Sequence, residues 1–349
     1  NAPRGGILNA RILWTFSSAA FYLKNKAYLK EAEHAKEYIF NHFFDEDFGG
    51  TYWMLNADGS PADTKKQIYS QAFFIYALVE FYRTSGDEEV LKKAKELFSL
   101  IEKYSFDKDK NGYFEAYSRD WLLLDDVRLS DKDANEKKTM NTHLHLLEAY
   151  TNLFRVWKNP LLEMQLKNLI DLFLDKIINS ETYHLNLFFD ENWACKSFIQ
   201  SFGHDIEASW LLDEAATVLG DAETLQKVRN VVFRVADAAA EGLREDGGLM
   251  NEKDVVTNHL DTNCDWWPQA EAVVGFFNTF QLSNRESYLK KVFNSWNFIK
   301  ENLLDKENGE WYWSVSKDGH KDTLNDKAGF WKCPYHNSRM CIELINRIK

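Results

Sequence analysis

The sequence has few of the features that mark disulfide-bonded, zinc-binding or membrane-spanning proteins. Only four of its 349 residues are cysteine, namely Cys195, Cys264, Cys333 and Cys341. None of them forms a C-x-x-C pair, and their spacings match no zinc ribbon or finger. We therefore expect reduced thiols, as is typical of a cytoplasmic protein. No run of about 18 apolar residues is present, so the sequence predicts no membrane-spanning helix.

An excess of positive charge is also absent. The formal net charge is −12 at pH 7, which argues against nucleic acid or an anionic membrane as the partner. No signal peptide is visible, and we expect a cytoplasmic location. Aromatic residues, in contrast, are abundant, with 12 Trp, 15 Tyr and 25 Phe. An acidic, aromatic-rich chain is typical of proteins that handle sugars, whose C–H faces pack on flat rings, so we expect a small-molecule partner.

Two kinds of helical segment alternate along the chain. Segments such as 28–44, 88–104 and 223–243 are amphipathic with charged outer faces, whereas segments such as 71–84, 144–157, 208–220 and 270–280 are apolar nearly all round. The second kind is expected to be buried on most sides. Short turns rich in Gly, Asn and Asp stand between them, for example "FDEDFGGTYW", "FDKDKNGYF" and "LREDGGLMNE". These turns predict short β-hairpins.

Polar or aromatic residues mark the expected starts of six buried helices. Successive markers are separated by 58, 72, 63, 63 and 69 residues, which indicates an internal repeat. The markers are Arg11, Tyr69, Asn141, His204, Trp267 and His336. Five amphipathic helices are expected between them.

This pattern predicts an all-α fold, an (α/α)6 toroid or barrel with short β-hairpin loops, as a single catalytic domain over residues 1–349. The inner helices of such a ring run parallel, so the six marked starts are expected to open on one face. Only ten residues precede Arg11, and we expect the first outer helix to be missing from this sequence.

The stretch "SFGHDIEASW", residues 201–210, carries the first candidate for catalysis. His204 and Glu207 are three residues apart and share one helix face, which Trp210 continues. A helix N-terminus disfavours the imidazolium, so His204 is predicted to be a neutral imidazole and a competent base, oriented by Glu207. The alternative is a capping or core histidine with an acid placed favourably in the first turn.

The stretch "FWKCPYHN" repeats this arrangement near the C-terminus. Pro334 suits the first position of a helix, which places His336 in the first turn of another buried helix. Two histidines at corresponding ends of different repeats favour an acid/base site that uses both.

The stretch "NTHLHLLE" offers two further histidines. His143 and His145 are two apart and must point in different directions from a helix. Because Asn141, His145 and Glu148 share a face, we predict that His145 is functional and His143 is structural.

Two charged residues lie in segments that are otherwise apolar. A buried, unpaired charge is costly, so Arg11 and Glu271 each need a partner. A structural ion pair between them remains an alternative to contacts with a ligand. Trp266, Trp267 and Trp331 lie near helix starts, where they are candidates for the walls of a sugar site, with core packing as the alternative.

Metal binding is not expected. The H-x-x-E order of His145 with Glu148 and of His204 with Glu207 reverses the E-x-x-H order of di-iron helical bundles. The spacing of Asp261 and Cys264 in "DTNCDWW" is too loose for a zinc set.

Five strings together resemble one enzyme family. They are "RILWTFS", "NTHLHLLEAY", "SFGHDIEASWLL", "DWWPQAEAVVGF" and "FWKCPYHNSRM", and they resemble cellobiose 2-epimerases within the N-acylglucosamine 2-epimerase superfamily. The resemblance implies an (α/α)6 barrel. It also implies that the protein needs no cofactor and is a monomer. It further implies epimerisation at C2 of the reducing-end glucose of β-1,4-linked disaccharides, converting cellobiose to glucosyl-mannose and lactose to epilactose.

The resemblance also implies roles for individual residues. His204 and His336 would be the two acid/base residues, and Glu207 and Glu271 would orient them or contact the substrate. The opened sugar and its enediolate would be held by Arg11, Tyr69, Asn141 and His145. The sugar subsites would be lined by Trp267 and Trp331, with Trp266 beside them.

Three other functions remain open at this point. The first is a 2-epimerase or aldose–ketose isomerase acting on a monosaccharide, either mannose or N-acylglucosamine. The second is an (α/α)6 glycoside hydrolase, which would need a carboxylate pair such as Glu207 and Glu271 across the scissile bond. The third is a sugar-binding protein without catalytic activity.

Overall fold

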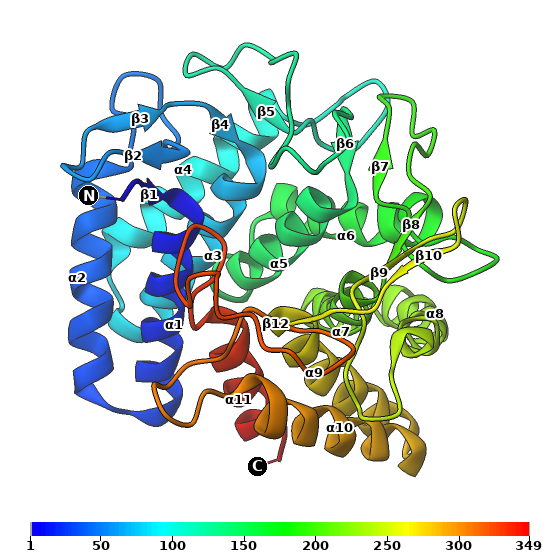
Figure 1. Cartoon of the computed structure of the whole chain (residues 1–349). Helices are drawn as coiled ribbons and strands as arrows, with labels where there is room; N and C mark the ends of the chain where they lie inside the picture. Colours follow the sequence, from blue (N-terminus) through cyan, green and yellow to red (C-terminus); the bar gives the residue numbers. More distant parts are fainter. Residues whose placement is uncertain (1, 349) are drawn as a thin grey trace. The chain divides into compact units, whose positions relative to one another are not determined.

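The computed structural model describes residues 2–348, and within them helices dominate while every strand is two or three residues long (Figure 1). The eleven expected helices are present in this range, but only five of the six that were expected to be apolar have that composition. The apolar helices are α1 (Gly6–Leu23), α3 (Ile68–Ser85), α5 (Met140–Val156), α7 (Phe202–Leu219) and α9 (Trp266–Ser283). The last helix, α11 (Tyr335–Ile348), was expected to be apolar but is amphipathic, with polar residues along the side that it does not bury. The amphipathic helices are α2 (Lys26–His42), α4 (Glu88–Tyr104), α6 (Pro160–Leu172), α8 (Ala222–Ala239) and α10 (Glu286–Phe298).

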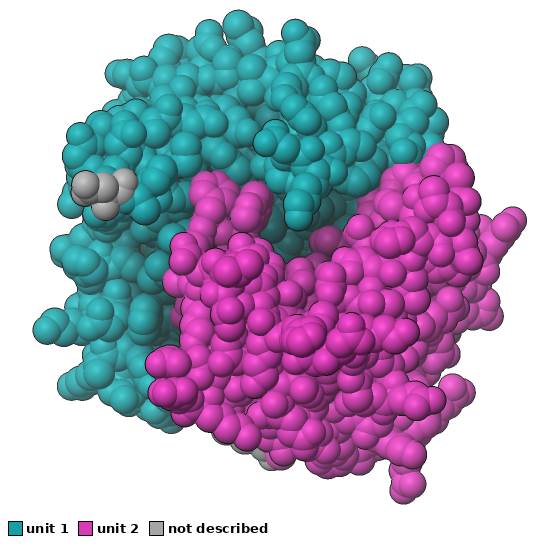
Figure 2. All heavy atoms as spheres, viewed as in Figure 1, with its two compact units in different colours: residues 1–169, 188–196 teal, residues 170–187, 197–349 magenta. Residues whose placement is uncertain are grey.

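The chain forms two compact units, coloured separately in Figure 2. Unit 1 comprises the residues up to Leu169 together with Phe188–Lys196, and unit 2 comprises Ile170–Leu187 and the residues from Ser197 onward. In unit 1, α3 packs against both α1 and α5, while α2 packs on α1 and α4 on α3. In unit 2, α9 packs against both α7 and α11, while α8 packs on α7 and α10 on α9. Each unit therefore repeats one arrangement, an apolar helix with an amphipathic partner.

The burial of these helices follows their composition. In α3, every residue from Ile68 to Phe81 is buried, as expected of a helix that is apolar all round. In α4, the Asp87 side chain caps the N-terminus by accepting the Glu89 N–H, and charged residues cover the exposed face. No helix among residues 2–348 combines the length and the apolarity that crossing a membrane requires. The four cysteines are free thiols, two buried and two exposed.

The short strands pair antiparallel, and they lie just before the apolar helices or in the turn-rich segments. Unit 1 contains the sheets β1 (Arg4–Gly5), β2 (Met54–Leu55) and β3 (Pro61–Asp63); β4 (Lys66–Gln67) and β5 (Ala116–Tyr117); and β6 (Lys138–Thr139) and β7 (Phe188–Phe189). Unit 2 contains β8 (Ile199–Ser201), β9 (Glu252–Asp254) and β10 (His259–Asp261), and the pair β11 (Cys264–Asp265) and β12 (Ser314–Val315). Short π or 3-10 segments end three amphipathic helices, namely η1 (Phe173–Ile177), η2 (Ala240–Gly242) and η3 (Ile299–Leu303).

Four apolar helices hold the preceding hairpin with the side chain at their fourth position. In each case this side chain bonds the main chain of the residue that closes the turn, over 2.7–3.0 Å. The pairs are Gln71 with Thr51, His143 with Tyr113, Asp205 with Leu185, and Gln269 with Leu249. A buried main-chain group without such a partner would be costly, so these bonds fix the start of each helix against its hairpin.

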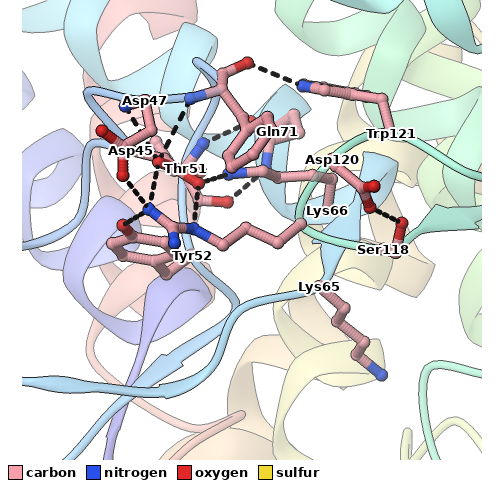
Figure 3. A network of polar contacts seen from close by, with 12 residues as sticks. Asp45, Asp47, Thr51, Tyr52, Lys65, Lys66, Gln71, Ser118, Asp120 and Trp121 are labelled. Carbon is pink, nitrogen blue, oxygen red and sulfur yellow. Dashed lines mark hydrogen bonds and ion pairs between the residues drawn. The ribbon is translucent and has the colours of Figure 1, made fainter.

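The hairpin before α3 shows how firmly this docking is made (Figure 3). The Asp45 carboxylate accepts hydrogen bonds from the fully buried Lys66, at 2.8 Å, and from Arg119, at 2.9 Å. The indole N–H of Trp121 donates to the Phe48 carbonyl at 2.9 Å and so covers the turn. Burial alone would raise the pKa of Asp45, but the bonds from Arg119 and Lys66 outweigh it and hold this pKa well below its usual range.

Two helix starts differ from the prediction. α1 begins at Gly6, so Arg11 lies in its second turn and not at its start. The Asn9 side chain, in the first turn of this helix, donates to the Gly5 carbonyl at 2.8 Å. α11 begins at Tyr335, so Pro334 immediately precedes the helix and His336 is its second residue.

Candidate active site

The candidate site residues occupy equivalent positions of the repeated helices. Positions two and six of a helix are four residues apart and therefore lie on one face. The residues at position two are Tyr69, Asn141, Trp267 and His336. The residues at position six are Arg11, His145, Glu207 and Glu271. His204 stands at position three of α7.

In unit 1 the structure brings together residues from α1, α3 and α5. The Arg11 Nη2 donates to the Tyr69 hydroxyl at 3.1 Å, and the guanidinium lies 4.5 Å from the centre of the Phe73 ring. The His145 ring lies against both aromatic rings, at 4.8 Å from Tyr69 and 4.6 Å from Phe73. Phe73, at position six of α3, was not among the predicted residues.

The His145 ring is oriented by an acid on its own helix. Its Nδ1 lies 2.9 Å from Oε2 of Glu148, and both residues are buried. A carboxylate acceptor at Nδ1 fixes the hydrogen on that nitrogen. One turn earlier, Oδ1 of Asn141 is buried and has no hydrogen-bond partner among the described residues. Because buried polar atoms are nearly always bonded, this oxygen is a candidate contact for a ligand hydroxyl.

His143 has the structural surroundings that the sequence predicts. Its Nδ1 lies 2.7 Å from the Thr139 carbonyl, and its Nε2 accepts the Tyr113 N–H at 3.0 Å. Burial lowers the pKa of His143 to about 4, so the ring is neutral at physiological pH. With both nitrogens bonded to the main chain, this histidine holds α5 to its hairpin.

In unit 2 one indole neighbours both predicted catalytic histidines. The Trp267 ring on α9 lies 4.8 Å from the His204 ring on α7 and 5.8 Å from the His336 ring on α11, centre to centre. Three separate helices therefore bring two imidazoles next to one indole ring. His204, Trp267 and His336 thus form a group of neighbouring rings within unit 2.

Gly203 explains how Trp267 approaches α7 so closely. A Cβ atom at residue 203 would lie 2.6 Å from the Trp267 ring and 2.9 Å from Pro268. Both distances are shorter than real Cβ contacts, so any other residue would displace the indole. The glycine in "SFGHD" is thus required by packing next to the histidine.

Both predicted catalytic histidines, His204 and His336, are held through Nδ1. The Nδ1 of His336 lies 2.8 Å from Oε1 of Glu271, as the predicted orienting role of this acid requires. The Nδ1 of His204 lies 2.8 Å from the hydroxyl of Ser201, a partner that the sequence did not reveal. The orienting role predicted for Glu207 stays a prediction.

A buried arginine that the sequence analysis did not identify joins the two acids. The Arg339 Nη2 donates to Glu207 at 2.5 Å and to Glu271 at 2.7 Å, and the side chain is 1% exposed. The indole N–H of Trp210 donates to the other oxygen of Glu271 at 3.0 Å. Arg339 lies in a helix with several other polar residues, so the argument that identified Arg11, a charge within an apolar helix, would not have identified it.

This arginine sets the charge of Glu271. Burial alone would raise the pKa of Glu271, but the charges of Arg339 and His336 and their hydrogen bonds outweigh it and hold this pKa below its usual value. Glu271 is therefore ionised at neutral pH. A glycoside hydrolase needs one carboxyl group to remain protonated as the general acid, and Glu271 does not fit that role.

One group of side chains has ligand atoms close enough to hold a metal ion. The carboxylates of Glu207 and Glu271 and the imidazole of His336 place one atom each within 4.8 Å of one another. However, the Arg339 guanidinium already donates to both carboxylates and balances their charge. A divalent ion would have to displace it, so these residues fit an ion-pair network better than a metal centre.

The two remaining tryptophans have different surroundings. Trp266 is buried with its ring 4.5 Å from Trp313, in the packing expected of a core residue. Trp331 is half-buried in the loop before α11, next to Phe330 at 4.9 Å. Its predicted role in a sugar subsite stays a prediction.

Comparisons with known proteins agree with these features. A cellobiose 2-epimerase from Bacteroides fragilis is 55% identical over 344 residues, which cover 99% of this chain and 88% of that protein. A cellobiose 2-epimerase from Ruminococcus albus is 43% identical over 347 residues, with the same two coverages. The solved structure of cellobiose 2-epimerase from Bacillus thermoamylovorans has a TM-score of 0.95 at 42% identity, over 99% of this chain and 89% of that chain.

These likenesses confirm the predicted α/α barrel class and the predicted resemblance to isomerases of this type. The family model described as N-acylglucosamine 2-epimerase matches residues 1–339. The chain therefore belongs to the N-acylglucosamine 2-epimerase family.

Proposed function

We propose that this protein epimerises the reducing-end glucose of β-1,4-linked disaccharides at C2, without a cofactor, by proton transfer through His204 and His336. The observation that carries the proposal is the position of Trp267, whose ring neighbours both imidazoles. Relatives named cellobiose 2-epimerase support a disaccharide substrate. The single catalytic domain predicted for residues 1–349 is part of the same proposal.

The chemistry explains why two bases are needed. The C2–H of an aldose becomes acidic only after the sugar ring opens to the aldehyde. One imidazole then removes the C2 proton and leaves a cis-enediolate. Inversion requires that a proton return from the opposite face, so a second imidazole must supply it, and the two exchange roles in the reverse reaction.

The surroundings of the two histidines suit these roles. Because Nδ1 of His336 is bonded to Glu271, its Nε2 is the nitrogen that exchanges a proton with the substrate. The ionised Glu271 also stabilises the imidazolium that forms when His336 accepts a proton. A sugar stacked on Trp267 would lie beside both bases, since C–H faces of sugars pack on aromatic rings.

The negative charge of the enediolate needs stabilisation of its own. The resemblance assigns this role to Arg11 and His145, whose cation and imidazole suit an oxyanion. Tyr69 bonds Arg11 and restricts its guanidinium, and Glu148 does the same for His145. We propose that Asn141 binds a substrate hydroxyl through its buried, unbonded Oδ1.

Product analysis tests the substrate and the reaction class together. The purified protein is incubated separately with cellobiose, lactose, mannose and N-acetylglucosamine, and each product is identified by NMR. We expect glucosyl-mannose from cellobiose and epilactose from lactose. Faster turnover of a monosaccharide would overturn the disaccharide assignment, free glucose from cellobiose would identify a hydrolase, and binding of cellobiose without any product would leave only a sugar-binding protein.

A further inference from the structure

The side chain at the fourth position of α3, α5, α7 and α9, here called the docking residue, bonds the preceding hairpin. The docking residue of α7 differs chemically from the other three. Gln71 and Gln269 are amides, and His143 is neutral because burial lowers its pKa to about 4. At the same position α7 carries Asp205, an acid that is fully buried. Of these four hairpins, the one before α7, the helix of His204, is therefore held by a carboxyl group.

Asp205 bonds a titratable side chain of its hairpin in addition to the main chain. Its Oδ1 accepts the Leu185 N–H at 2.8 Å, as in the repeat, and its Oδ2 lies 2.6 Å from Nδ1 of His184. His184 is 3% exposed, and its ring packs against Phe202, the first residue of α7, at 6.0 Å. One carboxylate thus holds both the main chain and a side chain of the hairpin.

The titratable groups facing His184 come from two elements. Asp205 on α7 bonds its Nδ1, and Glu241 in η2 lies 3.6 Å from its Nε2. Glu241 is exposed, whereas Asp205 is not, so Asp205 is the partner that water screens least.

This pair lies directly beside a proposed catalytic base. His204 immediately precedes Asp205, and its Nδ1 is bonded to Ser201 at the end of β8. The first turn of α7 is therefore fixed from two sides, by Ser201 and by the hairpin that Asp205 holds. We propose that the His184–Asp205 ion pair positions His204 for proton transfer, an inference that rests on the proposed function of His204.

The charges of the pair make this positioning sensitive to pH. Burial would lower the pKa of His184, but the bond to Asp205 and the charges of Asp205 and Glu241 outweigh it and raise this pKa above its usual value. The imidazolium of His184 therefore persists to a higher pH than that of an ordinary histidine, and it is lost as the pH rises through the raised pKa. The amides of Gln71 and Gln269 do not titrate, so their docking bonds are unaffected by this change.

Kinetics of matched variants test the inference. In His184→Gln we expect kcat to fall about tenfold, since small displacements of a catalytic group are costly. We expect KM to change little, because Trp267 and Glu271 belong to α9. Asp205→Asn keeps an acceptor for the Leu185 N–H and should retain more kcat than Asp205→Ala. The matched control is His259→Gln, since His259 is exposed on β10, and its kcat and KM should equal those of the wild type.

A structural readout keeps the inference independent of activity. The ring nitrogen signals of His204 are followed by 15N NMR in the wild type and the variants, and we expect them to shift in His184→Gln but not in His259→Gln. Unchanged His204 signals and unchanged kcat in a folded His184→Gln protein would overturn the positioning role. If the wild type shows no epimerase activity, the proposed function fails and the NMR signals alone decide the positioning role. If His184→Gln does not fold, Asp205→Asn is judged by the same two readouts.

Discussion

Gly203 links the local sequence at the first proposed catalytic histidine, His204, to the packing of Trp267 in the proposed sugar site. A Cβ there would lie 2.6 Å from the Trp267 ring, so Gly203→Ala should displace the indole. We expect a loss of about 1–3 kcal/mol in the free energy of unfolding, the usual cost of overpacking, together with a raised KM for cellobiose.

The matched control for this change is Gly329→Ala, because no atom lies within 4 Å of the Cβ that it introduces. Its unfolding free energy and KM should equal those of the wild type. A Gly203→Ala protein with a wild-type KM would show that Trp267 does not bind the sugar.

The two proposed catalytic histidines are expected to be separately essential. His204→Ala and His336→Ala should each lower kcat by at least about 10²–10⁴-fold, the usual contribution of a positioned acid or base. Their circular dichroism spectra should remain those of the wild type. His34→Ala, on the exposed face of α2, is the control. Near-normal kcat in either catalytic variant would refute the two-base mechanism.

Arg339 should matter for stability as well as for the site. Arg339→Met leaves the carboxylates of Glu207 and Glu271 buried without their shared cation. Breaking a buried pair in this way costs about 3–5 kcal/mol, which urea denaturation would measure. Arg128→Met removes an exposed pair with Asp126 and should leave the unfolding curve unchanged. Equal stability of the two variants would contradict the network described for Arg339.

At the scale of elements, the periodicity of the sequence predicted the eleven helices and the hairpins between them, although α11 is amphipathic and not apolar. These features depend on local composition, such as the continuous apolar run of α3 and the Gly-containing turns. The predicted start of α1 was wrong because the true start depends on a distant contact, the bond from the Gly6 N–H to the Trp53 carbonyl. Arg339 and Glu207 are 132 residues apart in sequence, so their pairing likewise needed the structure.

Part of the candidate site was also predictable from the sequence. Position in the repeat identified His204, His336 and Trp267, and the structure places their rings together. Docking bonds such as Asp205 with Leu185 could not be predicted, because an acid in the first turn of a helix also fits a simple interaction with the helix dipole.

The hairpin before α3 makes a prediction about pH. The folded-state pKa of Asp45 lies below its usual value, so its ion pairs with Lys66 and Arg119 stabilise the protein above the unfolded-state pKa of about 4 and are lost as the pH falls towards the folded-state value. Asp45→Asn should therefore lower Tm at pH 7 and lower it less at pH 3. An equal loss of Tm at both pH values would show that these ion pairs do not account for the stabilisation.

At the scale of the whole molecule, the acidic charge and the abundant aromatic residues fit a neutral sugar as the partner. Family membership rests on residues 1–339 and on relatives matched over 99% of the chain. The proposed function adds a specific reaction to this membership, in which one imidazole removes the proton at C2 and a second imidazole supplies a new proton. An imidazole exchanges its proton with water, and this exchange provides the most direct test.

The protein is incubated with cellobiose in heavy water, and the recovered disaccharides are examined by NMR and mass spectrometry. The account predicts glucosyl-mannose that carries deuterium at C2 of its reducing-end sugar, and gradual deuteration of C2 in the recovered cellobiose. Glucosyl-mannose formed without deuterium at C2 would contradict proton exchange through His204 and His336.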